Sequence, residues 1–192
     1  SKLREIVSVK DFGAKGDGVT DDTAAIQAAL NAGVIAYTPG NYEFVTTSKL
    51  IAVSGAGLIG DGEGSRIRLA GITTDSVIEG NGVTDFYIDG VVLDGDNSVK
   101  VSGSHGVKAT NCHNWHIGWL KVVRAQNWGV AFYWGSTGNR IDSLVVEDAK
   151  TSSALMFSGS SGNKVGKLIA KRCGGFGAQI FDGSHEDQID VI

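Results

Sequence analysis

Proline and cysteine are scarce in this sequence. A single proline among 192 residues excludes a collagen-like chain, which combines a strict glycine repeat with abundant proline. Cys112 and Cys173 are too few for a disulfide framework, and neither belongs to a Cys-x-x-Cys pair. The four histidines lack the spacing of a zinc site. We therefore expect a chain that holds no metal and no cofactor.

A large charge excess of one sign and long apolar runs are lacking as well. Lys and Arg number 17 against 21 Asp and Glu, and no run of basic residues offers a nucleic-acid footprint. No apolar run approaches the roughly 18–20 residues of a membrane span. The charged start, Ser1–Glu5, does not resemble a signal peptide. These absences argue against nucleic-acid and membrane partners.

Glycine, by contrast, is abundant, with 28 residues, about twice the usual share of roughly 7 %. Residues 7–12 alternate as in a short strand, and a glycine-rich loop follows at 13–18. An alanine-rich helix is expected near residues 20–32, capped by Thr20. We interpret residues 1–53 as an N-terminal cap of short strands and this helix.

Residues 54–192 carry an internal repeat of 24 residues. The segments 135–141, 159–165 and 183–189 all begin with Gly-Ser and end on an apolar residue. An earlier unit at 86–94 matches with five extra residues. The apolar position recurs in four successive units, at Ile117, Ile141, Val165 and Ile189. Agreement over several columns indicates a repeat architecture.

The pattern inside each repeat is that of strands. Apolar residues alternate, and no stretch keeps a helical period over two turns. A unit of 24 residues is too small to bury its own apolar face, so neighbouring units must stack. Strands stacked like on like run parallel, about 4.8 Å apart. The sequence therefore predicts an all-β chain folded as a parallel β-helix with rungs of about 24 residues.

The segment from Val7 to Leu30 reads VSVKDFGAKGDGVTDDTAAIQAAL. It resembles the start of members of the pectate-lyase-like β-helix superfamily, above all of bacteriophage tailspike proteins. Later residues resemble this superfamily only in the kind of repeat that they form. The resemblance implies a right-handed, three-faced β-helix whose N-terminal end is covered by the helix. It also implies a place in the virion tail, a parallel homotrimer, and a bacterial capsule or O-antigen polysaccharide as partner.

The resemblance also bears on the acidic start of the chain and on its length. Asp17, Asp21 and Asp22 are structural in this interpretation, with a calcium site as the functional alternative. Tailspikes are usually longer than this chain, which stops inside a rung just after Ile189. We therefore expect a part of a longer protein, with an active site either here or beyond Ile192.

Candidate catalytic carboxylates fall in two columns of the repeat. Glycoside hydrolysis uses two carboxyl groups, about 6.5–9.5 Å apart in inverting enzymes. Asp94 and Glu147 share a column two rungs apart, hence about 9.6 Å, and both are expected to point outward. Asp142 and Asp190 form the second such column. The alternative is that these carboxylates only solvate a face.

A lyase would need a base and a cation that neutralises a uronate carboxylate. Arg124 and Arg172 share a column with Asp148 between them, so they are candidates for holding an acidic sugar. The alternative, which we favour, is a surface charge ladder.

Aromatic residues suggest binding surfaces. Tyr133, Phe157 and Phe181 recur at intervals of 24, and the next column holds Phe132, Met156 and Ile180. Adjacent columns of a strand face opposite ways, so one of the two is expected to be an exposed apolar stripe. A trimer contact by Tyr133, Phe157 and Phe181 is favoured, with a platform for sugars or cover by a loop as the alternatives. Four tryptophans within 20 residues are candidates for substrate binding: Trp115, Trp119, Trp128 and Trp134.

Together these features favour a tailspike segment that binds a bacterial surface polysaccharide and, in the intact protein, depolymerises it. A glycosidase is favoured over a lyase. The alternatives are a non-catalytic receptor-binding or structural segment of a tail fibre and a bacterial pectate-lyase-like enzyme.

Overall fold

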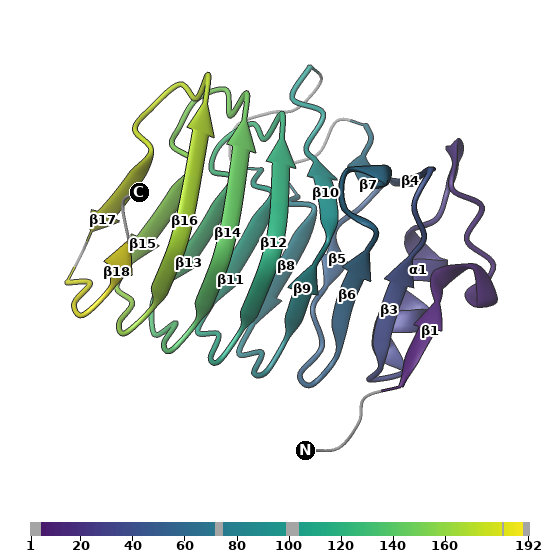
Figure 1. Ribbon diagram of the computed structural model, residues 1–192, viewed down its shortest axis with the longest axis horizontal. Helices are drawn as coiled ribbons and strands as arrows, with labels where there is room; N and C mark the ends of the chain where they lie inside the picture. Colours follow the sequence, from purple (N-terminus) through teal and green to yellow (C-terminus); the bar gives the residue numbers. More distant parts are fainter. Residues whose placement is uncertain (1–4, 72–74, 99–103, 182, 190–192) are drawn as a thin grey trace.

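The computed structural model of the chain describes residues 5–71, 75–98, 104–181 and 183–189. Within these ranges every paired strand runs parallel to its neighbours. Figure 1 shows the strands stacked side by side along one axis. The predicted parallel β-helix is confirmed.

Three faces run along the coil. The first face consists of β1 (Ile6–Ser8), β3 (Ile35–Thr38), β6 (Gly57–Gly60), β9 (Tyr87–Asp89), the starts of β12 (His116–Val123), β14 (Arg140–Glu147) and β16 (Lys164–Lys171), and β18 (Gln188–Ile189). The second face consists of β2 (Asp17–Asp21), β4 (Tyr42–Thr46), β7 (Ser65–Leu69), β10 (Val91–Asp94) and the ends of the same three long strands. The third face consists of β5 (Leu50–Ile51), β8 (Ile78–Asn81), β11 (Val107–Thr110), β13 (Val130–Tyr133), β15 (Leu155–Ser158) and β17 (Ala178–Phe181).

The turn length agrees with the repeat where the repeat is clearest. Strands β12, β14, β16 and β18 begin at residues 116, 140, 164 and 188, so the rung of 24 residues is confirmed for these turns. Earlier turns are less regular, since β6 begins at 57 and β9 at 87. Pairing runs continuously across residue 53, because β3, β4 and β5 pair with β6, β7 and β8. The two sequence segments therefore share their sheets.

The helix α1 (Thr23–Asn31) takes the place of a third-face strand in the first turn and lies at the N-terminal end of the coil (Figure 1). Its buried residues Ile26, Ala29 and Leu30 join the main core, so the predicted helix near the N-terminus is confirmed. The expected cap at Thr20 is wrong, because Thr20 lies in β2 and its hydroxyl donates to Asp17. In the described ranges no helix is long and apolar enough to cross a membrane.

The three early aspartates hold the loop and the start of α1. Asp22 accepts hydrogen bonds from the backbone N–H groups of Lys15 and Gly16, which pins the glycine-rich loop. Asp17 accepts from the backbone and hydroxyl of Thr20, and these bonds lower its pKa to about 2. Asp21 accepts from the hydroxyl groups of Thr23 and Thr47.

The Gly-Ser-x-Gly-Asn repeat marks a corner between the third and first faces. Gly135, Gly138, Gly159 and Gly162 all have positive φ there, which glycine adopts without strain. Behind them lies a buried ladder. The side-chain oxygen of Asn163 accepts from the backbone N–H of Asn139 (3.0 Å) and from its amide (2.8 Å). Asp187 repeats this pattern toward Asn163, so each turn binds the next through a polar side chain inside the coil.

The predicted aromatic column is wrong in register. The turn between β14 and β15 is one residue longer than those before β13 and β17. Phe157 therefore pairs with Phe132 and lies fully buried in the core, whereas Tyr133 pairs with Ser158 and Ser158 with Phe181. Because an alternate residue in a strand faces the opposite side, this single insertion removes the continuous exposed stripe.

A buried histidine contacts Tyr133 on the outside of the third face. The rings of His105 and Tyr133 are stacked with centroids 5.9 Å apart, and Nε2 of His105 lies 2.9 Å from the tyrosine hydroxyl. Burial lowers the pKa of His105 to about 4; Lys108 acts in the same direction and Glu79 opposes it.

Stability is expected to fall as the pH decreases from about 6.5 to about 4. In this window the unfolded chain binds a proton at His105 that the folded chain does not, which gives a slope of up to about 1.4 kcal/mol per pH unit. Urea unfolding at several pH values measures it. His105→Gln should flatten the slope, and His185→Gln, at an exposed histidine, should not. A slope that survives in His105→Gln would contradict the assignment.

Candidate functional site

A row of polar and aromatic side chains follows the outside of the first face, one per turn. Strand register places Tyr87 beside His116, His116 beside Arg140, Arg140 beside Lys164, and Lys164 beside Gln188. Their neighbours Ile88, Ile117, Ile141 and Val165 are buried in the core. The row therefore projects outward by the ordinary alternation of a strand.

Asp142 connects members of this row. The Nε2–H group of His116 donates to its Oδ2 at 2.8 Å, and Nε of Arg140 donates to its Oδ1. Partial burial acts to raise the pKa of Asp142, but the bonds from His116 and Arg140 outweigh it and the pKa lies below its ordinary value. Asp142 therefore stays ionised and only accepts. Within the described residues Nδ1 of His116 makes no hydrogen bond, which leaves it available as a base.

Tyr87 lies on the other side of His116. The two rings meet edge to face with centroids 5.3 Å apart, and the Tyr87 hydroxyl donates to Asp89 at 3.1 Å. Burial and the neighbouring Asp89 raise the pKa of Tyr87, so its phenol keeps its proton. Asp89 in turn accepts from the backbone N–H of Trp119 at 2.7 Å.

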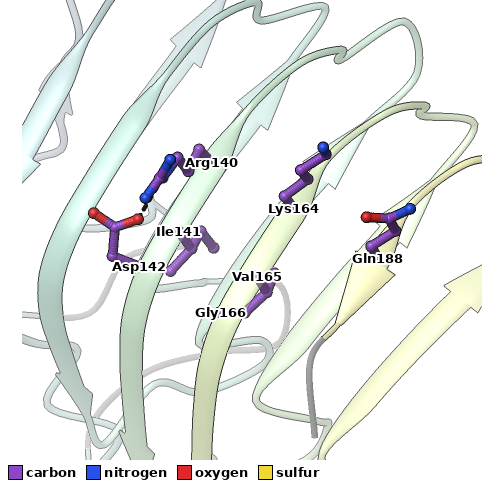
Figure 2. Close-up of a pocket in the computed structure, with 7 residues that line it drawn as sticks. All are labelled: Arg140, Ile141, Asp142, Lys164, Val165, Gly166 and Gln188. Carbon is purple, nitrogen blue, oxygen red and sulfur yellow. Dashed lines mark hydrogen bonds and ion pairs between the residues drawn. The ribbon is translucent and has the colours of Figure 1, made fainter.

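Glycines leave room beside the row. A cavity of about 220 Å³ opens next to Asp142 and is bordered by Arg140, Lys164 and Gln188 (Figure 2). Gly166 lies in it, and a Cβ at this position would come 3.0 Å from the backbone oxygen of Asp142. Figure 2 shows Arg140 and Lys164 extending from adjacent strands on the same side of the sheet. The first face thus combines two cations, a possible base and a small recess.

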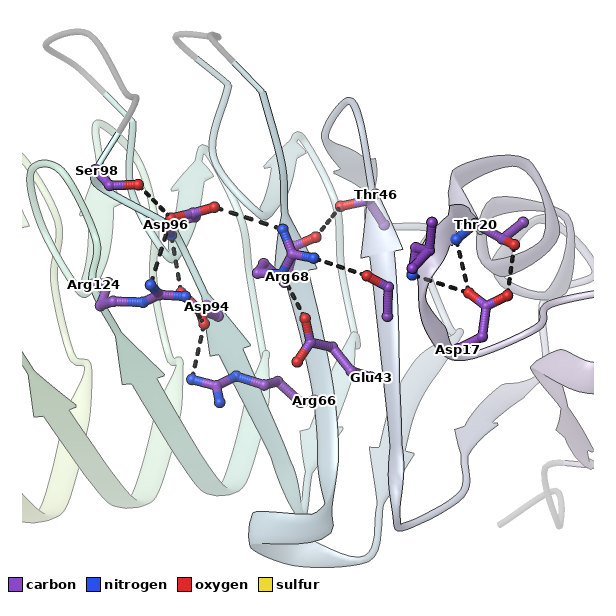
Figure 3. Close-up of polar contacts among 12 residues, drawn as sticks. Asp17, Thr20, Glu43, Thr46, Arg66, Arg68, Asp94, Asp96, Ser98 and Arg124 are labelled. Atoms are coloured by element: carbon purple, nitrogen blue, oxygen red, sulfur yellow. Dashed lines mark hydrogen bonds and ion pairs between the residues drawn. The ribbon is translucent and has the colours of Figure 1, made fainter.

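The predicted carboxylates Asp94 and Glu147 share a column as expected, but Asp94 is not exposed as expected. Asp94 pairs with Val123 and Val123 with Glu147, so the shared column is confirmed. Asp94, however, is fully buried rather than exposed, because Arg66 and Arg124 cover it (Figure 3). Arg66 approaches at 2.8 Å, and Nε of Arg124 donates at 2.9 Å.

Glu147, like Asp94, forms ion pairs with two basic side chains. Lys171 lies 3.1 Å away and Lys121 3.5 Å away, and the hydrogen bond from Lys171 leads the effects that lower the pKa of Glu147. A general acid of a glycosidase needs a raised pKa, and the pKa of Glu147 is lowered instead. Asp94 is closed to a substrate in another way, because it is fully buried beneath Arg66 and Arg124. Of the second predicted column, Asp142 lies on the first face, and Asp190 lies outside the described residues.

The predicted arginine ladder has the expected geometry. Arg124, Asp148 and Arg172 all adopt positive φ at the same corner. Arg172 donates to Asp148 at 2.6 Å, and Arg124 donates to Asp94. Each arginine is thus already paired with a carboxylate, which agrees with a charge ladder.

The four tryptophans have different surroundings. Trp115 is buried in the core, where its indole N–H donates to the backbone oxygen of Val83, so its predicted role in substrate binding is wrong. Trp128 packs on the outside of the third face against Met156 and meets Phe181 edge to face. Trp119 is half-buried at the corner of the first and second faces, and Trp134 is 65 % exposed.

The family described as rhamnogalacturonase A/epimerase, pectate lyase-like, matches residues 6–188. The chain belongs to this family. The pre-neck appendage protein of Bacillus phage PZA is 32 % identical over 139 residues, covering 61 % of the chain and 15 % of that protein. Alginate lyase 7 of Azotobacter vinelandii is 36 % identical over 109 residues, covering 46 % of the chain and 12 % of the lyase.

Solved structures show the same fold at lower identity. A protein from Parabacteroides merdae aligns with a TM-score of 0.80 at 17 % identity, over 96 % of this chain and 97 % of its own. The A-module of the mannuronan C-5 epimerase AlgE6 from Azotobacter vinelandii aligns with a TM-score of 0.69 at 20 % identity, over 95 % and 57 %. The resemblance of residues 7–30 to the pectate-lyase-like superfamily is thus confirmed.

Sequence reasoning on this pectate-lyase-like chain missed Tyr87, His116, Arg140 and Lys164 as a group. The signal was present, because each of the last three directly precedes a residue of the aligned apolar column. Reading one position before that column would have predicted a polar row on one face.

Proposed function

We propose that this chain is the polysaccharide-contacting part of a phage tail appendage or spike, and that its first face binds an acidic glycan. The observation that carries the proposal is the row Tyr87, His116, Arg140 and Lys164, with Asp142 orienting the histidine. Cations one turn apart suit a polymer with one carboxylate or sulfate per sugar. The matches to phage tail proteins and to an alginate lyase support this class of ligand.

The chemistry that suits this face is β-elimination rather than hydrolysis. Lys164, together with the terminal nitrogens of Arg140, whose Nε alone is held by Asp142, would neutralise the carboxylate of a uronic acid. Nδ1 of His116 would take the proton from the carbon beside it. The electron pair of that C–H bond becomes the new double bond, and the glycosidic oxygen leaves with the Tyr87 hydroxyl proton. The glycosidase expected from the sequence has less support, because the carboxylates it needs are held by cations.

The intact protein would use this face in the virion tail, as a homotrimer. Of the residues predicted for the trimer contact, Phe181 is exposed and remains the candidate, whereas Tyr133 is half-buried and held by His105. Phe157 is excluded, because it lies fully within the core.

His116→Gln is expected to lower the release of unsaturated uronate from polymannuronate at least a hundredfold, because it removes the base. The assay follows unsaturated-uronate absorbance and reducing ends together. Arg140→Gln with Lys164→Gln should weaken binding about tenfold or more, and Lys167→Gln, an exposed lysine of the same strand outside the cavity, should not. Binding that the double variant leaves unchanged would overturn the proposal. Binding without any product would favour a non-catalytic receptor-binding segment.

A further inference from the structure

A larger recess lies on the third face. Its cavity of about 430 Å³ opens over β5, β8 and β11 and is bordered by Lys49, Ile51, Glu79, Asn81, Lys108 and Thr110. This volume is within the range of small-molecule sites, about 300–1,000 Å³. It belongs to a different sheet from the row at Tyr87 and His116.

The recess is built by strand alternation. Glu79 pairs with Ile51 and with Lys108, and Asn81 pairs with Thr110, so they form two outward columns. In the same strands the alternate residues Ile78, Val107 and Ala109 face the core and are fully buried. The floor of the recess is thus a rigid sheet, which keeps the outward groups in fixed positions.

An aromatic side chain lies one turn beyond the recess, next to its lining residue Thr110. Thr110 pairs with Tyr133 in the next turn, and His105 holds the tyrosine by stacking and through its hydroxyl. Trp128 covers Ala131 and Met156 beside it. The outward surface therefore changes from an open polar recess to a covered aromatic ridge within one turn.

The two lysines that border the recess differ in their ion pairs. Lys49 is paired with Glu79 at 3.0 Å and with Asp75 at 3.4 Å. Lys108 makes no ion pair within the described part of the chain, and its ammonium lies 5.9 Å from the centre of the Tyr133 ring. A free ammonium beside an aromatic ring, with amide and hydroxyl groups opposite, matches an acidic sugar, whose C–H face packs on rings while its anion needs a cation.

We propose that this third-face recess is a second glycan-binding site, which takes one acidic pyranose. The carboxylate or sulfate ester pairs with Lys108, the sugar ring contacts Tyr133, and Asn81 and Thr110 bond its hydroxyl groups. We assign this site a binding role only, because the carboxylate that borders it, Glu79, is already held by Lys49 and by the backbone N–H of Ser76. It shares the ligand class of the proposed function but does not depend on the first face. On a long polymer the two sites act together and raise the apparent affinity.

Acylation of lysine amines, read by mass spectrometry, tests both faces in the unaltered chain. Lys108 reports on the third face, Lys164 on the first, and exposed Lys167 serves as the control. With saturating oligomannuronate, acylation of Lys108 is expected to slow at least fivefold and that of Lys167 to stay constant. Oligosaccharides of ι-carrageenan test whether sulfate replaces carboxylate, and neutral dextran should protect neither lysine.

The two proposals fail separately in this experiment. An unchanged Lys108 rate with both acidic oligosaccharides overturns the second site, whatever happens at Lys164. If the oligosaccharides slow acylation at Lys108 but not at Lys164, the result contradicts glycan binding on the first face and leaves the second site standing. Tyr133→Leu should remove protection at Lys108 and leave Lys164 protected, whereas persistence of protection at Lys108 in this variant would exclude the tyrosine contact.

Discussion

Asn163→Ala is expected to lower the free energy of unfolding by about 3–5 kcal/mol. The Asn163 side chain accepts from the backbone and the amide of Asn139, and it donates to the backbone oxygen of Ser136. All of these groups are buried, so alanine leaves several without partners, at about 1–3 kcal/mol each. For a chain of this size the melting temperature should fall by about 2–4 °C per kcal/mol.

The matched control is Asn31→Ala. This asparagine is exposed at the end of α1, and its side chain accepts from Gln27. The change should stay within about 0.5 kcal/mol, as for most surface substitutions. Equal losses in the two variants, measured by urea unfolding, would mean that the buried ladder does not hold the turns together.

The same ladder explains why the fold could be predicted from the sequence. The ladder position recurs at Asn139, Asn163 and Asp187, and positive-φ glycines recur at the same corner, because successive turns use one corner geometry. This recurrence is the 24-residue period. The helix α1 was predictable from composition, but not its start. Thr20 has the residue type of a cap, yet its hydroxyl and backbone are used by Asp17 three residues earlier.

The register between faces was less predictable. One extra residue in the turn before β15 moved Phe157 from a predicted surface stripe into the core, while the total period stayed at 24 because the next turn is shorter. A constant period therefore does not guarantee a constant register on every face. Only the lengths of the individual turns decide which side chains point inward.

The site could be predicted in part for a similar reason. Column alignment correctly placed Asp94 and Glu147 in one row. It could not reveal that Asp94 is buried, because its partners come from turns on either side, at Arg66 and Arg124, where the period departs from 24. Whether an outward carboxylate faces water or a guanidinium depends on these irregular neighbours.

Asp94→Ala is expected to destabilise the chain by about 3 kcal/mol, with little direct effect on chemistry at the first face. Its carboxylate accepts from Arg66, from Arg124 and from the backbone N–H of Asp96 (2.9 Å). Removing one member of a buried ion pair costs about 3–5 kcal/mol. The value at the lower end applies here, because both arginine side chains keep more than a third of their surface exposed, at 38 % and 39 %.

Asp142→Ala separates a structural carboxylate from a functional one. Asp142 is 39 % exposed, so its loss should change stability by no more than about 1 kcal/mol while it releases His116 and impairs the first face. The two variants should therefore show opposite patterns in thermal unfolding and in the polymannuronate assay. If Asp94→Ala instead abolished activity at unchanged melting temperature, Asp94 would be a catalytic carboxylate. The hydrolytic pair expected from the sequence would then be favoured over elimination, since a column two rungs apart suits a water between two acids.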